Sequence, residues 1–485
     1  MSTHILILFG ATGDLVSRMV VPALFHLFET NRLPDEFKVL GFSRRDLSNE
    51  DFKDLVRIAV VDHLEKENEV PPEFLNLFEY QKGDYTKVED YNHLHKRISI
   101  IDEDQNSCSN KLFHLAVPPK YYAEILTNLS SSKLDKTCIV GENWTRILVE
   151  KPYGSDLIEA IRIDEMLGKI FKDEQIYRID HYLAKELLQN IIIFRFANNL
   201  LEHVWDNRSV EKIEVKLLEN IGIEGRGATY DSLGALLDIG QNHLLQMLAL
   251  VTMDAPDDLG PEAIRRARSR LLKDVSVLND EEIVNGTTRG QYLGYLSETG
   301  IKKNSMTETY FKIKTTINSR RWQGVPIILE AGKRAPRTEK EIAVTFYPSK
   351  MLSSTARSTG LNKNTVYFRL EPNPGIAIRF WSKSPGPTNA LEQQVMDFKY
   401  EDIASGVRHL EGYSRLILDS IKGDQTLFIT GEEAISGWHF IDPVIRAWRE
   451  NKVPLDIYSS DEESFNLMGY DESDAIVDAT TIRGA

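Results

Sequence analysis

The sequence predicts an α/β protein in which a doubly wound parallel sheet is followed by a larger α+β domain with a mostly antiparallel sheet. Three observations predict it. The chain opens with a short apolar run, a glycine-containing turn and a helical pattern. Short apolar runs then alternate with helical patterns as far as about residue 180, and beyond that point several apolar runs have period 2.

Length and composition set the outer limits of the prediction. A chain of 485 residues favours two or more domains, and its 42% apolar content is ordinary for a globular protein. We expect no membrane span and no signal peptide, and the net charge of −15 argues against non-specific nucleic-acid binding. The two cysteines, Cys108 and Cys138, form neither a metal-ligand spacing nor a disulfide framework, which favours a cytoplasmic protein without a metal site.

The first elements follow the order strand, turn, helix, strand. Ile5–Phe9 is a short apolar run, "RMVVPALFHLFETNRLP" has helical periodicity, and a second strand is expected around Val39–Phe42. Further short strands are expected in "KLFHLAVPP", "TRILVEKP" and "QIYRID". Strands that alternate with helices imply a Rossmann-like parallel sheet, which is expected over residues 1–180.

The second part, residues 181–485, has a different pattern. In "KIEVKLLE" the apolar Ile213, Val215 and Leu217 alternate with charged residues, so we expect an antiparallel sheet with one buried face and one wet face. The same period recurs in "YFKIKTTI", "EIAVTFYP", "NTVYFRL" and "GIAIRFWSK". "GALLDIGQNHLLQMLALVTM" is apolar nearly all round, which predicts a buried helix. The acidic tail from "SSDEESFNLMGYDESD" is expected to be loose or partly docked.

The turn "GATGDL" indicates a dinucleotide site. Gly10 can bring the backbone close to a pyrophosphate and Gly13 permits close helix packing, although such glycines can also serve only for positive φ. At the end of the second strand stand Ser43, Arg44 and Arg45, where an NAD enzyme tends to have a carboxylate. An arginine there suits the 2′-phosphate of NADP; the alternative is a solvated basic loop.

"RIDHYLAKE" suggests a phosphate pocket. If it is helical, His181 and Lys185 share one face, with Asp180 beside them; an ordinary solvated face is the alternative. In the apolar helix, Asp238 and His243 carry a desolvation cost that asks for an explanation. Were His243 near Asp180, the two would form a general base with an orienting carboxylate.

These motifs together resemble the glucose-6-phosphate dehydrogenase family over nearly the whole chain, from "GATGDL" to "GDQTLFI" and "DPVIRAW". "RIDHYLAKE" is similar to the family signature, which usually has Gly where Ala184 stands. "EKPYG", "EGRG", "QNHLLQ" and "RWQGVPIILEAGK" are also similar to family motifs. The joint match is too specific to arise by chance.

The resemblance implies NADP-dependent oxidation of glucose 6-phosphate at C1, the first step of the oxidative pentose phosphate pathway, by a cytoplasmic homodimer. It implies His243 as the general base and Asp180 as its orienting carboxylate. The sugar-phosphate groups would be Lys151, His181, Tyr182, Lys185, Glu219, Asp238 and Lys333. The NADP groups would be Gly10, Thr12, Gly13, Asp14, Leu15, Arg44 and again Lys151.

The sequence departs from the family pattern at several positions. Met19 and Thr338 stand where basic residues are expected, and Arg337 or Lys340 could substitute for the second of these. Glu330 and Thr430 stand where the family often has arginines that help to hold a second, structural NADP. Two alternatives therefore stay open: C1 oxidation of a related phosphorylated or anionic hexose, and a non-catalytic paralogue that binds NADP or sugar phosphate.

Overall fold

The computed structural model describes residues 3–64, 70–104, 107–137, 143–349, 363–387, 391–400, 412–466 and 468. The chain divides into two units. Unit 1 takes in residues 1–185, 256–266 and 409–435, and unit 2 takes in residues 186–255, 267–408 and 436–485. The division into domains 1–180 and 181–485 stays a prediction, and unit 1 draws two later segments into its fold.

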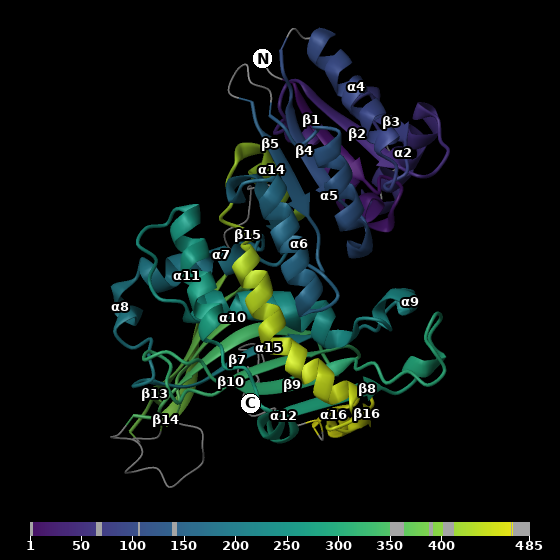
Figure 1. The fold of residues 1–485 in the computed structure, drawn as a ribbon. Helices are drawn as coiled ribbons and strands as arrows, with labels where there is room; N and C mark the ends of the chain where they lie inside the picture. The colour runs from purple at the N-terminus through teal and green to yellow at the C-terminus, as the bar shows by residue number, and fades with distance from the viewer. Residues whose placement is uncertain are drawn as a thin grey trace. The chain divides into compact units, whose positions relative to one another are not determined.

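Unit 1 is built on a seven-stranded sheet in the order β15-β6-β5-β4-β1-β2-β3, in which only β15 is antiparallel to its neighbour (Figure 1). The doubly wound parallel sheet predicted from the sequence is confirmed. The strands are β1 (His4–Phe9), β2 (Phe37–Ser43), β3 (Phe78–Lys82), β4 (Asn110–Leu115), β5 (Thr145–Val149), β6 (Ile176–Ile179) and β15 (Phe428–Ile429).

The helices of unit 1 form two groups, as right-handed crossovers to either side of β1 require. In one group α1 packs against α2 and α14, and in the other α5 packs against α4 and α6. The helices are η1 (Val16–Val20), α1 (Val21–Glu29), α2 (Asn49–Leu64), α3 (Pro72–Leu75), α4 (Val88–Asp104), η2 (Pro119–Tyr121), α5 (Tyr122–Ser131), α6 (Leu157–Ile170), η3 (Asp173–Gln175) and α14 (Gly412–Lys422).

Unit 2 contains a nine-stranded sheet in the order β14-β13-β12-β11-β7-β10-β9-β8-β16, which is mostly antiparallel, as predicted. Two pairs, β10 with β7 and β16 with β8, are parallel. The strands are β7 (Val210–Leu218), β8 (Thr287–Tyr292), β9 (Tyr310–Thr315), β10 (Ile327–Gly332), β11 (Glu339–Phe346), β12 (Thr365–Glu371), β13 (Gly375–Lys383), β14 (Leu391–Lys399) and β16 (Leu455–Tyr458).

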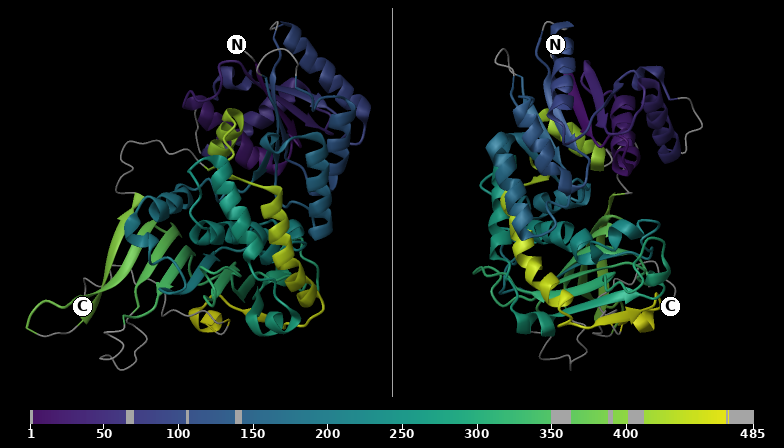
Figure 2. Two further views of the ribbon diagram at one scale, coloured as in Figure 1. Left: turned by 60° about the vertical axis from the view of Figure 1, so that its left-hand side comes forward. Right: turned by 45° about the vertical axis from the view of Figure 1, so that its right-hand side comes forward.

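One face of this sheet is covered by helices, with η4 on β7 and β10 and α7 on β12 (Figure 2). The predicted apolar helix is confirmed as η4 (Leu236–Leu244) continued by α10 (Leu245–Thr252), and both are almost wholly buried. The other helices of unit 2 are α7 (Glu186–Phe196), α8 (Asn199–Glu202), α9 (Gly227–Tyr230), α12 (Asp280–Gly286), η5 (Tyr295–Ser297) and α16 (Glu462–Asn466). Two helices, α11 (Pro261–Asp274) and α15 (Gly431–Arg449), contribute residues to both units.

The expectation of a wet face on β7 is wrong. Glu214 and Lys216 are buried, at 5% and 4% exposure. Lys216 forms an ion pair with Glu339 at 3.2 Å, and it lies opposite Glu330 on one side and Glu341 on the other. Charges of opposite sign on neighbouring strands allow this face to be buried, because each buried charge has a partner.

The cysteines and the acidic tail were two further subjects of the sequence analysis. Cys108 is disulfide-bonded in the structure, although the spacing of the cysteines does not predict it, and Cys138 lies outside the described residues. The acidic tail beyond Met468 also lies outside them. Among the described residues no helix is long and apolar enough to cross a membrane.

Candidate active site

The glycine-containing turn directly follows β1. Gly10 has φ +84°, and a Cβ there would lie 2.2 Å from the carbonyl oxygen of Ala116 beside β4. Both the positive φ and the close approach require glycine. Gly13 donates its backbone N–H to Gly10 O at 2.8 Å, which closes the turn before η1. The backbone conformation alone therefore requires glycine at position 10, whether or not Gly10 also binds a cofactor.

The end of β2 presents a guanidinium group at the same edge of the sheet. The exposed Arg44 lies over the rings of Tyr85 and Tyr121, with its Cζ 5.6 Å and 5.2 Å from their centroids. Cation–π contacts of this kind hold a guanidinium in place while leaving its N–H groups available. The two tyrosines were missed at the sequence level, because nothing in their spacing connects them with β2.

Hydrogen bonds tie the β2 end to the turn after β1. The buried Ser43 hydroxyl lies 3.2 Å from the Thr12 hydroxyl and 3.0 Å from the Tyr80 hydroxyl. Tyr80 also donates to the backbone oxygen of Arg45 at 2.6 Å. Of the other cofactor-turn residues, Leu15 directly precedes η1 and Asp14 forms an exposed ion pair with Arg18. Unit 1 thus brings the predicted cofactor residues of β1 and β2 together.

Lys151 follows β5 in a segment that buried polar groups anchor. The preceding Glu150 lies 2.9 Å from Nε2 of His114 and accepts a hydrogen bond from Tyr413, and its backbone oxygen accepts one from Tyr122 at 2.9 Å. Burial and the neighbouring carboxylate raise the pKa of Tyr413 well above its usual value, so it remains a donor. These three residues lie on β4, α5 and α14, far from Glu150 in the sequence. The sequence therefore indicated only the motif "EKPYG" and not the residues that bond to it.

The predicted helix at "RIDHYLAKE" is wrong at its start. Strand β6 ends at Ile179, two turns follow, and α7 begins only at Glu186. Asp180, which is fully buried, accepts the backbone N–H of Tyr182 at 3.0 Å, and Lys185 N donates to Tyr182 O. A carboxylate that accepts a backbone N–H two residues on favours a turn over a helix.

These turns still bring side chains of the predicted phosphate pocket together. The rings of His181 and Tyr182 are 5.1 Å apart, and Lys185 Nζ lies 4.9 Å from the centroid of the Tyr182 ring. The Cβ of Ala184, where the family signature has glycine, lies 3.5 Å from the position that a Cβ at Gly412 would occupy. The buried alanine therefore has a glycine as its neighbour.

In unit 2, Asp238 and His243 lie on η4, the predicted buried helix, which has π-helical winding. Residues five apart diverge by about 140° on an α-helix. On a π-helix the backbone bonds run between residues five apart, so Asp238 and His243 lie on nearly the same side. His243 is buried at 2% exposure, whereas Asp238 is only partly buried, contrary to expectation.

Glu219 and Lys333 form the core of an ion-pair cluster in unit 2. Lys333 Nζ forms an ion pair with one carboxylate oxygen of Glu219. Lys340 Nζ lies 2.9 Å from the second oxygen of Glu219 and 2.7 Å from a carboxylate oxygen of Glu371. Burial alone raises the pKa of Glu219, but the charges and hydrogen bonds of Lys333 and Lys340 outweigh it and lower the pKa to about 2. Glu219 is therefore a carboxylate at any physiological pH.

Arg337 and Lys340 were the two candidates to supply the basic group that is expected at Thr338. The Thr338 hydroxyl is bonded to Asn220 at 2.9 Å, and Arg337 pairs with Glu339 at 3.3 Å. Lys340 forms the ion pair with Glu219, at 2.9 Å. Glu371 was missed because it lies on β12, about thirty residues further along the chain than its partner.

Two of the other departures, Glu330 and Thr430, have local structural roles. Glu330 is fully buried and accepts a hydrogen bond from Tyr310 at 2.8 Å. Thr430 caps the start of α15, where its hydroxyl accepts the N–H of Glu433 at 3.0 Å. Met19 is an exposed residue of η1. Among the described residues, no group of three or more His, Cys, Asp or Glu side chains could hold a metal ion.

Comparisons with known proteins match both parts of the chain to one family. Residues 7–190 match the model for the NAD-binding domain of glucose-6-phosphate dehydrogenase, and residues 192–477 match the model for its C-terminal domain. A glucose-6-phosphate 1-dehydrogenase of Chlamydia pneumoniae is 34% identical over 466 residues, with 93% of this chain and 90% of the relative covered. The cytoplasmic glucose-6-phosphate 1-dehydrogenase 6 of Arabidopsis thaliana is 37% identical, with 91% and 85% covered.

A solved structure of glucose-6-phosphate dehydrogenase in complex with its substrate glucose-6-phosphate matches with a TM-score of 0.85 and 30% identity, over 97% of this chain and 98% of that one. Fold and comparisons together define an oxidoreductase with a Rossmann-like NAD(P)-binding domain. More particularly, the chain belongs to the glucose-6-phosphate dehydrogenase family.

Proposed function

We propose that this chain oxidises glucose 6-phosphate at C1 to 6-phosphogluconolactone, with NADP as the hydride acceptor, in the first step of the oxidative pentose phosphate pathway. The observation that carries the proposal is the match over nearly the full chain to family members, one of them solved with glucose-6-phosphate bound. The chain also carries the motifs that resemble those of the family, apart from the departures named above.

Each site residue has a separate role in the proposed reaction. His243 takes the proton from the C1 hydroxyl, and Asp180 orients the imidazole and stabilises its charged form. When bound, NADP supplies the hydride acceptor. His181, Tyr182 and Lys185 bind the 6-phosphate, and the sugar hydroxyls bond to Glu219 and Asp238. Lys151 and Lys333 complete the site. The pairing of Asp180 with His243 is part of this proposal.

The choice of NADP over NAD rests on Arg44. Its guanidinium is exposed at the end of β2 and is held over two tyrosine rings, in the place where NAD enzymes have a carboxylate. The residues present fit a phosphorylated ribose, because a planar guanidinium can bond a phosphate with two N–H groups at once. Gly10, Thr12, Gly13, Asp14 and Leu15 would hold the rest of the dinucleotide, with Lys151 between cofactor and sugar.

The partners follow from the same proposal. The substrate is a sugar phosphate, and we expect a homodimer formed through the large sheet of unit 2. We place the protein in the cytoplasm, in agreement with the name of the Arabidopsis relative. No nucleic-acid or membrane partner is proposed.

A second candidate is the same oxidation on a different anionic hexose. Thr338 and Met19 favour it, because each removes a cation that the family pattern predicts. Lys340 argues for glucose 6-phosphate, since it brings a second ammonium group to Glu219. A non-catalytic paralogue has less support, because the sequence carries both the proposed general base, His243, and its proposed carboxylate, Asp180.

The test is NADPH formation, followed at the absorbance band of the reduced nicotinamide. Glucose 6-phosphate is compared with glucose, galactose 6-phosphate and glucosamine 6-phosphate. Fast, saturable turnover on glucose 6-phosphate alone is expected; a higher rate on another sugar would establish the second candidate. Binding of NADP without turnover on any of the four would point to the paralogue.

We further expect His243→Asn to abolish turnover while sugar-phosphate binding, measured by calorimetry, stays within about threefold of the wild type. The asparagine keeps a polar side chain but cannot accept the proton. Turnover near the wild-type rate in this variant would remove His243 from the role of base.

A further inference from the structure

Glu308 lies just before β9 and bonds to the segment that opens η4. Its backbone oxygen accepts the N–H of Ala235, and its Oε1 accepts the N–H of Leu236, each at 3.0 Å. The first N–H groups of a helix have no partner within the helix. A single residue just before β9 therefore satisfies two of them, at the start of the helix that carries Asp238 and His243.

Gly234 makes room for this contact. It has φ +73°, and a Cβ at this position would lie 2.4 Å from Glu308 Oε1. Any other residue would be strained by the backbone conformation and would also push the carboxylate away from the helix start. The glycine before η4 and the glutamate before β9 thus fit each other, although 74 positions separate them in the sequence.

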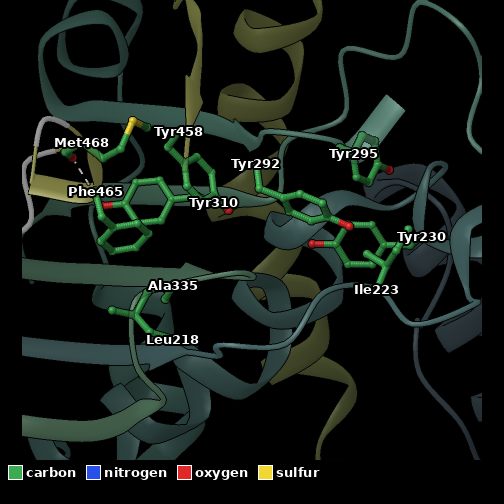
Figure 3. Packing of buried hydrophobic residues seen from close by; sticks show 10 residues of the cluster. All are labelled: Leu218, Ile223, Tyr230, Tyr292, Tyr295, Tyr310, Ala335, Tyr458, Phe465 and Met468. Carbon is green, nitrogen blue, oxygen red and sulfur yellow. Dashed lines mark hydrogen bonds between the residues drawn. The ribbon is translucent and has the colours of Figure 1, made fainter. Parts of the chain in front are cut away.

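The next residue, Thr309, ties the same segment to Lys333. Its backbone oxygen accepts the N–H of Lys333 at 2.9 Å. Its hydroxyl accepts the N–H of Tyr292 at 2.9 Å and lies 2.9 Å from the hydroxyl of Tyr458, which also bonds Lys333 O at 2.5 Å. Tyr292 and Tyr458 belong to a buried aromatic cluster with Tyr310 (Figure 3). Two successive residues therefore fasten the helix start on one side and Lys333 on the other.

Charge favours the same arrangement. Arg289 of β8 and Arg449 of α15 act on Glu308 electrostatically and favour its charged form, although burial dominates and raises its pKa to about 7. The carboxylate also lies at the positive end of η4. Two titratable neighbours of Glu308, Tyr230 and Tyr295, stay neutral because burial raises the pKa of each well above its usual value.

We propose that Glu308 is a positioning residue for the reaction: it holds the start of η4 at a fixed place relative to Lys333, and so places Asp238 and His243. The inference rests on the proposed function. Glu308 need not touch the sugar, because its effect passes through the two N–H groups that it accepts.

Three variants test this role. Glu308→Met removes the side-chain acceptor at nearly constant length, whereas Glu308→Gln keeps an oxygen that can accept the Leu236 N–H. Glu282→Met is the matched control, because Glu282 accepts a backbone N–H at the start of α12, which carries no proposed site residue. We expect Glu308→Met to lower kcat on glucose 6-phosphate at least tenfold. Glu308→Gln and Glu282→Met should stay within threefold of the wild type.

Hydrogen exchange supplies a readout that does not depend on activity. Backbone amides of residues 235–240 should exchange at least tenfold faster in Glu308→Met, and at the wild-type rate in Glu308→Gln. Equal kcat losses in Glu308→Met and Glu282→Met would reduce Glu308 to an ordinary stabilising contact. Wild-type exchange and kcat in Glu308→Met would overturn the inference outright.

A fourth variant, at Gly234, keeps the test decisive if the Glu308 variants do not fold. Gly234→Ala should also speed exchange at residues 235–240 and lower kcat, because its Cβ displaces the carboxylate. Failure of the proposed function would look different, since the wild-type protein would then not oxidise glucose 6-phosphate at all. The exchange results would still decide whether Glu308 holds η4.

Discussion

Replacement of Glu219 by glutamine should cost stability in a way that depends on pH. Glu219 is held between Lys333 and Lys340, and its pKa is about 2, against 4.5 for an ordinary glutamate. The pKa is lower in the folded state. The stabilisation is therefore fully present above about pH 4.5 and is lost as the pH falls towards 2.

The magnitude follows from the shift. Each pKa unit corresponds to about 1.4 kcal/mol, so a shift from 4.5 to about 2 contributes about 3 kcal/mol to the free energy of unfolding at pH 7. The Glu219 side chain is only 15% exposed, so solvent screening reduces this value little. At pH 3 the same shift leaves about 1.4 kcal/mol.

Urea unfolding followed by tryptophan fluorescence measures the effect. The gap in free energy of unfolding between the wild-type protein and Glu219→Gln should be about 3 kcal/mol at pH 7 and should narrow to about half that at pH 3. A gap that stays constant between these two pH values would refute the reasoning, because it would mean that the lysines do not lower the pKa of Glu219.

Two further predictions concern the substrate and cofactor groups. Lys340→Met should raise the KM for glucose 6-phosphate about tenfold or more, because a charge-assisted bond is worth about 1.5–3 kcal/mol, while Arg337→Met, the matched control, should leave it within threefold. Equal effects of the two variants in steady-state assays would contradict the assignment of Lys340. Arg44→Ala should weaken NADP at least tenfold more than NAD in fluorescence titrations, since only NADP has the 2′-phosphate. Equal losses for both cofactors would remove Arg44 from that role.

Periodicity was enough to predict both sheets, because burial of one face or of both leaves a direct trace in the order of apolar residues. It failed where burial followed another rule. The charged face of β7 has the pattern of a wet face, yet Lys216 is buried because Glu339 lies on the next strand. Strand β14 was missed for a related reason: "LEQQVMDFK" has neither strict alternation nor many β-branched residues.

Individual site residues were predictable where a motif carries them, and their supports were not. "RIDHYLAKE" indicated Asp180 and Lys185, but the spacing argument assumed a helix where Asp180 instead accepts the N–H of Tyr182 and forms a turn. A local side-chain bond of this kind competes with helix formation, and the apolar period of α7, further along, does not report it. Lys340 was left open against Arg337, because only strand pairing decides which of the two faces Glu219.

The π-helical winding of η4 was predicted neither by the apolar periodicity nor by a motif. An apolar sequence predicts that a helix is buried, but it does not show whether the backbone hydrogen bonds join residues four or five apart. Glu308 satisfies two N–H groups at the start of η4, and Gly234 admits its carboxylate. On this π-helix Asp238 and His243, which are five residues apart, lie on nearly the same side of the helix. On an α-helix they would diverge by about 140°. In the proposal made above, the position of His243 depends on Glu308, which lies 65 positions further along the sequence, and no local pattern around His243 reveals that residue.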